Sequence, residues 1–505
     1  MTTWSSNLIL ILLSCLVLID GLLAQAGVEK TVMLIEMTRH GARMPVYTAV
    51  KEDWTVGLKQ GEITPVGIRM HYYLGKEMLK RYPEILGKRL DTNEYFVRST
   101  DVQRTFVSAQ AHLFGIFNLT SAKKLPFKNG DERILPPIVA EQKMGTEVNL
   151  STPLPNNFEP VAIHTDLVVD DDVLFLLNSK KCPRGNREVK LLDTKILNDT
   201  AKDTMFKAMV ASAAQKYGID WKGNDPYRTC VDLGDFAIQD VVNNPNPKIP
   251  VTDPLFKRLS RCYEFNVAFR YLNPRLLGVT SSALIAEIVT KLRNFTETKE
   301  PVKEKYHYYS GHDSTLLPFL IMAKKVDLEC MNQSLYESVP SDCGMFPTVA
   351  SNIVFELNQI DKRYFVRVLS NFEPLDFCRL NNPLSDYRCP LETFEKVILK
   401  FIDPTWKDYC WEEENRPSDL PENIYNHKRL KASLHLWRSW ALVLIALLIL
   451  VILNIFYITA KLRELKRASE SNPSLRVTTD KSKMQAASFG LHADERHSPL
   501  VERDT

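Results

Sequence analysis

The sequence of 505 residues has few of the patterns that mark nucleotide-binding or nucleic-acid-binding proteins. Glycine occurs only 19 times, and no glycine-rich phosphate loop of the P-loop or dinucleotide-binding type is present. The 64 basic and 61 acidic residues leave a formal net charge of only +3, so no nucleic acid is expected as a partner. No internal repeat is evident. Any anion must therefore be bound by a local cluster of charged residues.

The cysteines lack the spacing of metal ligands, and no metal site is expected from them. Of the nine, Cys15 lies in an N-terminal apolar run, which leaves eight. An even number suits disulfides in an exported domain, although eight cysteines allow 105 pairings. Short separations favour the first two of the following links and leave the other two as longer ones: Cys330–Cys343, Cys378–Cys389, Cys230–Cys262 and Cys182–Cys410.

The N-terminal segment resembles a signal peptide. An apolar run from Leu8 to Leu18 precedes Ala24-Gln25-Ala26, a small-x-small pattern where a signal peptidase cuts, so we assign residues 1–26 to the leader. The segment before the run has no Lys or Arg, which leaves an uncleaved anchor as the alternative.

A second apolar segment, Trp440–Ala460, is long enough to cross a membrane. Its 21 positions, at ~1.5 Å each, reach the ~30 Å thickness of a bilayer core. With a leader in front, we expect a type I single-pass membrane protein whose large domain, residues 27–404, is lumenal or extracellular, in the lysosome or at the cell surface. Residues 405–439 join the domain to the membrane, and the polar tail 461–505 is expected to be cytosolic and disordered.

Five glycosylation sequons lie between the predicted leader and the predicted span, where glycan acceptors must lie. They are at Asn118, Asn149, Asn198, Asn294 and Asn332. The sequence leaves the oligomeric state open, with a homodimer as one option.

The pattern of apolar residues favours an α/β fold with a layered, mostly parallel sheet and helices on both faces. Three short apolar runs read as strands: Thr31–Thr38, Glu94–Val97 and Tyr306–Ser310. Helices are expected after Thr64-Pro65, which supplies an N-cap and a proline at the first helical position, and after Arg98-Ser99-Thr100-Asp101.

The middle of the chain, about residues 121–299, is expected to form a smaller helical lobe inserted between the two parts of the sheet, about 27–120 and 300–400. Helices are predicted at roughly 192–217 and 232–242. Two further runs, Ser351–Leu357 and Tyr364–Leu369, resemble a hairpin.

The most informative stretch is Arg39-His40-Gly41-Ala42-Arg43, directly after the first predicted strand. Two buried guanidiniums around an imidazole are costly unless an anion is expected there. A phosphate dianion would balance this positive charge, because each arginine can donate two parallel hydrogen bonds to its oxygens. Arg98 follows the second strand and His312-Asp313 follows the third. Since ligands bind at the carboxyl ends of strands, these segments are expected to converge.

These segments together resemble the histidine acid phosphatases, the branch of the histidine phosphatase superfamily that contains prostatic and lysosomal acid phosphatases and phytases. The resemblance runs from about residue 31 to about 410. It rests on Arg39–Pro45, Ile63–Gly67, Arg98–Thr105, Gly311–Asp313 and Cys389–Leu391, in the family's order.

The resemblance implies a role for each matching residue. His40 matches the nucleophile that attacks phosphorus, and Asp313 matches the proton donor to the leaving alkoxide. The family's groups that hold the three non-bridging phosphate oxygens are matched here by Arg39, Arg43, Arg98 and His312. The implied activity is hydrolysis of phosphate monoesters through a phosphohistidine, faster below neutral pH because Asp313 must be protonated. The arginines supply the positive charge, so neither a metal nor a cofactor is expected.

Two other functions stay open on the sequence. One is a selective phosphatase for inositol phosphates, lysophosphatidate or phosphotyrosine. The other is an inactive family member that serves as a surface receptor or adhesion glycoprotein. The second is disfavoured because every position of the catalytic set carries the required residue type.

Overall fold

The fold was analysed in a computed structural model. It describes residues 29–46, 50, 52–87, 93–117, 154, 159–178, 180–297, 304–378, 387–411, 457–464 and 467. The chain divides into two compact units, Met1–Pro417 and Ser418–Thr505. The larger unit holds the sheet and all of the predicted catalytic residues.

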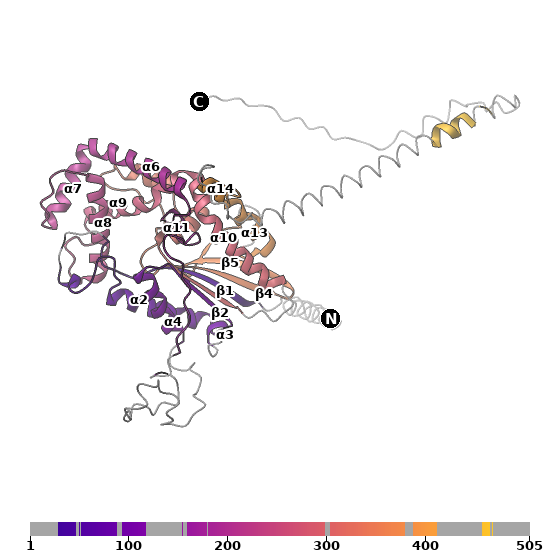
Figure 1. Ribbon diagram of the computed structural model, residues 1–505, viewed down its shortest axis with the longest axis horizontal. Coiled ribbons are helices and arrows are strands. Elements are labelled where there is room, and N and C mark those ends of the chain that lie inside the picture. Colours follow the sequence, from indigo (N-terminus) through magenta and orange to yellow (C-terminus); the bar gives the residue numbers. More distant parts are fainter. Residues whose placement is uncertain are drawn as a thin grey trace, which may run out of the picture. The chain divides into compact units, whose positions relative to one another are not determined.

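The centre of the larger unit is a mixed sheet with strand order β2-β3-β1-β4-β5-β6 (Figure 1). Its strands are β1 (Lys30–Arg39), β2 (Tyr95–Ser99), β3 (Tyr306–Gly311), β4 (Asn352–Ile360), β5 (Arg363–Ser370), β6 (Glu373–Leu375) and β7 (Cys389–Pro390), which pairs with β5. The expected strands and the β4–β5 hairpin are confirmed.

The expectation of a mostly parallel sheet is corrected. Only β3 runs parallel to its neighbours β1 and β2, whereas the other four pairs of the described strands are antiparallel. For the β4–β5 and β5–β6 pairs the reason is connectivity. The first three strands are joined through helices, which permit parallel pairing, while β4, β5 and β6 are joined by tight turns that require antiparallel pairing.

Helices α2 (Pro65–Arg81), α3 (Pro83–Leu86) and α4 (Gln103–Ile116) cover one face of the sheet (Figure 1). Thr64 caps α2 as predicted, since its side chain accepts from the Gly67 N–H. A Cβ on Gly75 of α2 would lie 2.1 Å from the His112 carbonyl oxygen of α4, so glycine lets these two helices pack closely. Residues such as Leu34 and Val97 bury their side chains beneath them.

The other face carries α10 (Pro274–Glu297), α11 (Asp313–Met322) and α13 (Leu391–Ile398) (Figure 1). Met33, Ile35 and Met37 of β1 share one continuous apolar core with α10 and with the helical lobe. Alternation along β1 therefore separates two environments: odd-numbered residues face the lobe side and even-numbered residues face α2 and α4.

The lobe is helical, as expected, but it holds more helices than the sequence indicated. These are α6 (Pro183–Lys202), α7 (Thr204–Lys216), α8 (Pro226–Asn243), α9 (Pro254–Ala268) and the short η6 (Phe269–Leu272). The predicted helical stretch 192–217 is divided at Asp203, whose side chain caps α7 by accepting from Phe206 N. The smaller elements are η1 (Asp53–Thr55), η5 (Leu176–Asn178), α12 (Leu328–Ser334), η7 (Leu399–Phe401) and α14 (Trp406–Cys410).

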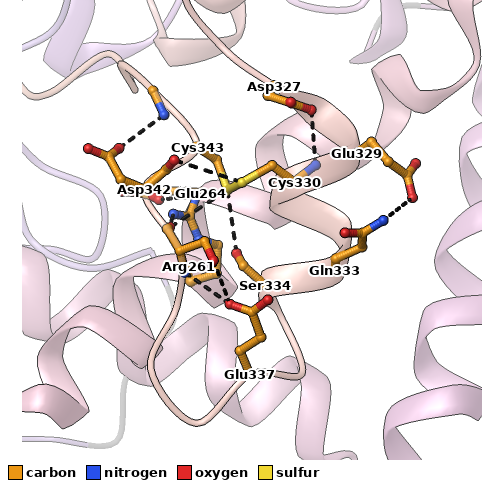
Figure 2. The surroundings of a disulfide bond; sticks show 12 residues. Arg261, Glu264, Asp327, Glu329, Cys330, Gln333, Ser334, Glu337, Asp342 and Cys343 are labelled. Carbon is orange, nitrogen blue, oxygen red and sulfur yellow. Dashed lines mark hydrogen bonds and ion pairs between the residues drawn. A yellow bond between two sulfur atoms is a disulfide. The ribbon is translucent and has the colours of Figure 1, made fainter.

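All four expected disulfides are present. Cys182–Cys410, Cys230–Cys262, Cys330–Cys343 and Cys378–Cys389 are bonded. Figure 2 shows the bond between Cys330 and Cys343, with Ser334 and Asp342 beside it and Arg261 close by. This bond ties α12 to the segment that leads into β4 and, through Arg261, which donates to the Ser341 carbonyl, to α9.

Several expectations fall on residues outside the described ranges. These are the leader 1–26, Asn118, Asn149, most of the predicted span 440–460 and nearly all of the tail. In the smaller unit, residues 457–464 form a helix with exposed side chains. Across the part of the chain that the structure describes, no helix has both the length and the apolar character needed to cross a bilayer.

Candidate active site

A cavity of about 630 Å³ opens at the carboxyl ends of β1 and β3. Volumes of roughly 300–1,000 Å³ are typical of sites for small organic ligands. Residues from the loop after β1, from α4, from the lobe and from the start of α11 line it. They are His40, Arg43, Val46, Arg104, Phe175, Arg228, Val231, Asp232, Asp235, Tyr263, Asn266, Val267, Arg270, His312, Asp313 and Ser314.

The ring of His40 is held in a defined tautomer. Its Nδ1 lies 2.9 Å from the Gly41 carbonyl oxygen. A carbonyl can only accept, so Nδ1 must carry the proton, and in the neutral ring Nε2 then holds the free lone pair. The side chain is 2% exposed and borders the cavity. His40 is thus arranged to offer Nε2 to a ligand.

Both cavity histidines are held neutral. Burial lowers the pKa of His40 well below its usual value, and Arg104, Arg39 and Arg43 lower it further. Burial and Arg104 likewise lower the pKa of His312, although Asp313 opposes them. The two rings lie edge to face with centroids 5.5 Å apart. Neutral imidazole is the nucleophilic form, and it also avoids adding charge to a site already crowded with arginines.

Asp313 sits at the first position of α11, beside His312. Its Oδ2 lies 2.9 Å from Arg39 Nη2 and accepts a 2.8 Å hydrogen bond from the Tyr263 hydroxyl, while Oδ1 accepts from Ser314 N. Burial raises the pKa of this carboxyl, but Arg39 and the Tyr263 hydrogen bond outweigh burial and lower it below its usual value. Asp313 is therefore a carboxylate in the ligand-free site.

Arg39 and Arg43 are both charged neighbours of His40, although only Arg43 lines the cavity, and each is paired with a carboxylate. Arg39 bonds Asp313 and donates to the carbonyl of Pro347. Arg43 Nη1 lies 2.9 Å from Asp235 Oδ2, which keeps the pKa of Arg43 above its usual value despite burial. Gly41 between them lies against α2, because a Cβ there would meet the Gly67 carbonyl oxygen at 2.3 Å.

Arg98, which was expected to hold phosphate, is not among the residues that line this cavity. Its guanidinium binds Asp166 and Asp171 and lies 4.0 Å from Glu287 of α10. The sheet register explains this placement. Arg98 pairs with Tyr309, whereas Gly311 pairs with Arg39, so Arg98 lies two residues, roughly 7 Å, short of the level of Arg39.

Arg104 occupies the place that was expected for Arg98. It lies in the first turn of α4, beyond the end of β2, and lines the cavity. Of the charged neighbours of His40, Arg104 lowers its pKa the most. Burial, followed by repulsion from Arg43, lowers the pKa of Arg104 to about 10. Among the described residues, no carboxylate lies within ion-pair distance of it.

The sequence did contain a signal for Arg104: an arginine in the first turn of the helix that follows a strand is placed at the ligand-binding edge of the sheet. Tyr263 gave no such signal. It reaches the site from the lobe helix α9, and its hydroxyl contacts Arg39 at 2.9 Å and Arg43 at 3.4 Å besides Asp313.

A buried polar chain supports the strand end from the α2 and α4 side. His71 of α2 donates from Nε2 to the Arg39 carbonyl at 3.0 Å, and its ring lies edge to face with that of His112. His112 Nε2 lies 3.1 Å from Glu36 Oε2 on β1. Burial lowers the pKa of His71 to about 3, so this ring is neutral and fixes the backbone next to His40.

The other sequence expectations concern the surface and metals. Asn198 and Asn294 are exposed and Asn332 is partly exposed, all on helices. Within the described ranges, no group of three or more His, Cys, Asp or Glu side chains is arranged to hold a metal ion.

The sheet, the helical lobe and an arginine-lined cavity around a neutral histidine define a phosphate-handling α/β enzyme. Residues 31–371 match the histidine phosphatase superfamily (branch 2). The chain belongs to this family and is a phosphatase.

Individual relatives agree with this assignment. Lysosomal acid phosphatase of Homo sapiens is 26% identical over 397 residues, which cover 74% of this chain and 78% of the relative. Prostatic acid phosphatase of Homo sapiens is 25% identical over 387 residues, which cover 74% of this chain and 86% of the relative. A solved structure of Hafnia alvei phytase in complex with tartrate aligns with a TM-score of 0.50 and 14% identity over 75% of this chain and 98% of that one. At that identity, the last likeness concerns the fold alone.

Proposed function

We propose that this protein is an acid phosphatase that hydrolyses phosphate monoesters with His40 as the nucleophile. The observation that carries the proposal is the hydrogen bond of His40: Nδ1 donates to the Gly41 carbonyl, which leaves Nε2 as the free base of a side chain that lines the cavity. A neutral imidazole fixed in this way can attack phosphorus directly.

The phosphoryl group is held by Arg104, Arg43 and His312, while Arg39 is paired with Asp313. Arg104 takes the part that we had expected of Arg98, because it is the cavity arginine beside His40 without a carboxylate partner among the described residues. An uncompensated, partly buried guanidinium favours an anion. In the attack, the bond from His40 Nε2 to phosphorus forms while the bond to the ester oxygen breaks, and the arginines stabilise the charge on the non-bridging oxygens.

Asp313 gives its proton to the departing alkoxide and then takes a proton from the water that hydrolyses the phosphohistidine. In the ligand-free site this group is ionised. A phosphate dianion placed beside it raises its pKa, because like charges disfavour ionisation. The catalytic rate therefore rises as the pH falls, because both the low pH and the bound substrate favour the protonated form of Asp313.

The surroundings proposed for this site are those of a type I membrane glycoprotein. The catalytic domain is lumenal or extracellular, in the lysosome or at the cell surface, and the subunit can pair as a homodimer. Four disulfides, which persist in oxidising compartments, support an exported domain. The human relative named lysosomal acid phosphatase supports the lysosome.

The test is an assay of the purified protein on an aryl phosphate and an alkyl phosphate between pH 4 and pH 8. Release of phosphate that is fastest at acid pH and absent in His40→Ala supports the proposal. A narrow preference for an inositol phosphate, lysophosphatidate or phosphotyrosine would make the enzyme a selective phosphatase. No hydrolysis at any pH would favour the receptor or adhesion glycoprotein.

A further inference from the structure

The cavity is larger than a phosphoryl group requires, and its outer wall is charged. Arg228 and Asp232 of α8, Asn266 of α9 and Arg270 of η6 line it together with the residues around His40. All four come from the helical lobe. The part of the substrate beyond the phosphoryl group therefore lies against this wall.

Most charges that line the cavity are already paired. Arg43 is bonded to Asp235 and Arg228 to Asp193, while Asp313 is bonded to Arg39. Paired charges of this kind need no further counterion.

Arg104 and Arg270 are different, because no described carboxylate lies within ion-pair distance of either. The Nε of Arg270 is buried and has no hydrogen-bond partner among the described atoms. Asp193 interacts electrostatically with Arg270, but its ion pair is with Arg228.

The larger of the two spaces that Arg270 borders among the described residues is the cavity around His40. Besides the cavity, Arg270 lines a pocket of about 30 Å³, which holds roughly one water molecule. The remaining negative charge on the cavity wall is Asp232, whose pKa is raised to about 6, first by burial and then by Asp235. At pH 5.5 this carboxyl is largely neutral, so the cavity presents two uncompensated guanidiniums.

We propose that Arg270 binds a second anionic group on the substrate, so that the preferred substrates are phosphate monoesters whose alcohol part carries a carboxylate or a further phosphate. The inference rests on the proposed function, because it assigns the first anion to the phosphoryl site at Arg104 and His40. A partly buried guanidinium without a partner gains a charge-assisted, two-point contact from such a group.

The experiment compares two substrates that differ in one charge. These are phenyl phosphates with a carboxymethyl or a carbamoylmethyl group at position 4, in which the methylene keeps the acidity of the two phenols similar. We expect wild-type kcat/KM at pH 5.5 to favour the acid about tenfold, the lower end of what a charge-assisted contact of roughly 1.5–3 kcal/mol contributes. Arg270→Gln should bring the ratio close to one, whereas Arg270→Lys keeps part of the preference.

Arg184→Gln is the matched control, because Arg184 is an exposed lobe arginine away from the cavity. It should keep the wild-type ratio. A wild-type ratio near one overturns the inference whether or not either variant folds, and an unchanged ratio in folded Arg270→Gln overturns it as well. Weaker inhibition of Arg270→Gln by inorganic phosphate, to the same extent as in Arg104→Gln, would place Arg270 in the phosphoryl site and overturn it as well. Failure of the wild-type enzyme to hydrolyse either substrate would instead overturn the proposed function.

Discussion

The hydroxyl of Tyr263 donates a 2.8 Å hydrogen bond to Oδ2 of Asp313, the same oxygen that lies 2.9 Å from Arg39. Through this contact a lobe residue controls the acidity of a carboxyl on the sheet side of the cavity. The hydrogen bond stabilises the ionised form, and it is among the causes that lower the pKa of Asp313.

Replacing Tyr263 with Phe removes that hydrogen bond while keeping the ring. The pKa of Asp313 should rise, so the protonated acid persists to higher pH. We expect the alkaline limb of the kcat profile for an alkyl phosphate to move to higher pH. The measurement is kcat from pH 4 to pH 8 for both proteins. An unmoved limb would show that Asp313 is not the group that titrates there.

Loss of the nucleophile should abolish turnover. For His40→Ala we expect kcat to fall about a thousandfold or more, as when the central group of a catalytic set is removed. The measurement is phosphate release at pH 5 together with trapping of the phosphoenzyme after rapid acid-free denaturation. Turnover at the wild-type rate would contradict the mechanism.

Asp313→Asn should separate the two chemical steps. The amide cannot donate a proton to the leaving oxygen, so hydrolysis of an alkyl phosphate is expected to fall by about 10²- to 10⁴-fold. An activated aryl phosphate needs little protonation and should still form phosphohistidine, which then accumulates because water lacks its base. Rapid-mixing experiments with a chromogenic aryl phosphate should give a burst of phenolate followed by a slow phase. Equal slowing of both substrates with no burst would argue against an acid and base role.

Arg104 and Arg98 form a matched pair for testing phosphate binding. Arg104 lines the cavity, whereas Arg98 is bound to Asp166 and Asp171. Arg104→Gln should weaken inhibition by phosphate and by vanadate about 10- to 100-fold, the worth of a charge-assisted hydrogen bond. Arg98→Gln should leave both inhibition constants within about twofold, although it should lower stability because buried Asp171 loses its partner. The reverse pattern would restore Arg98 to the site.

Stability should fall as the pH falls below about 6.5. The unfolded chain protonates His71 near its usual pKa of 6.5, but the folded protein does so only near 3. Between these values the unfolded state holds the extra proton, so acid favours unfolding. His40, His307 and His312 have pKa values lowered in the same direction.

His71→Gln tests this linkage at one site. The stability lost between pH 7 and pH 5 should be about 2 kcal/mol smaller than in the wild type, because one proton no longer binds on unfolding. Urea unfolding at the two pH values with the disulfides intact measures the difference. An equal loss in both proteins would mean that His71 is not neutral in the native state.

Much of the site could be predicted because local chemistry and chain order determine it. A buried strand that ends in Arg39-His40 and another that ends before His312-Asp313 meet wherever β1 and β3 pair in parallel register, and they do. Sequence separation favoured the two short disulfides, but the other four cysteines could still pair in about three ways, and the structure has Cys230–Cys262 and Cys182–Cys410.

What the sequence determined alone is therefore the strands, the motif at each strand end and the presence of a helical lobe. The tertiary structure decided which arginine reaches the cavity, which way the strands run and what the lobe contributes. The register of β2 leaves Arg98 two residues short of the level of Arg39, whereas Arg104 lies beyond the end of β2, in the first turn of α4. Tyr263 and Arg270 approach from helices distant in sequence, and only the packing of the lobe on the sheet brings their side chains to His40 and Asp313.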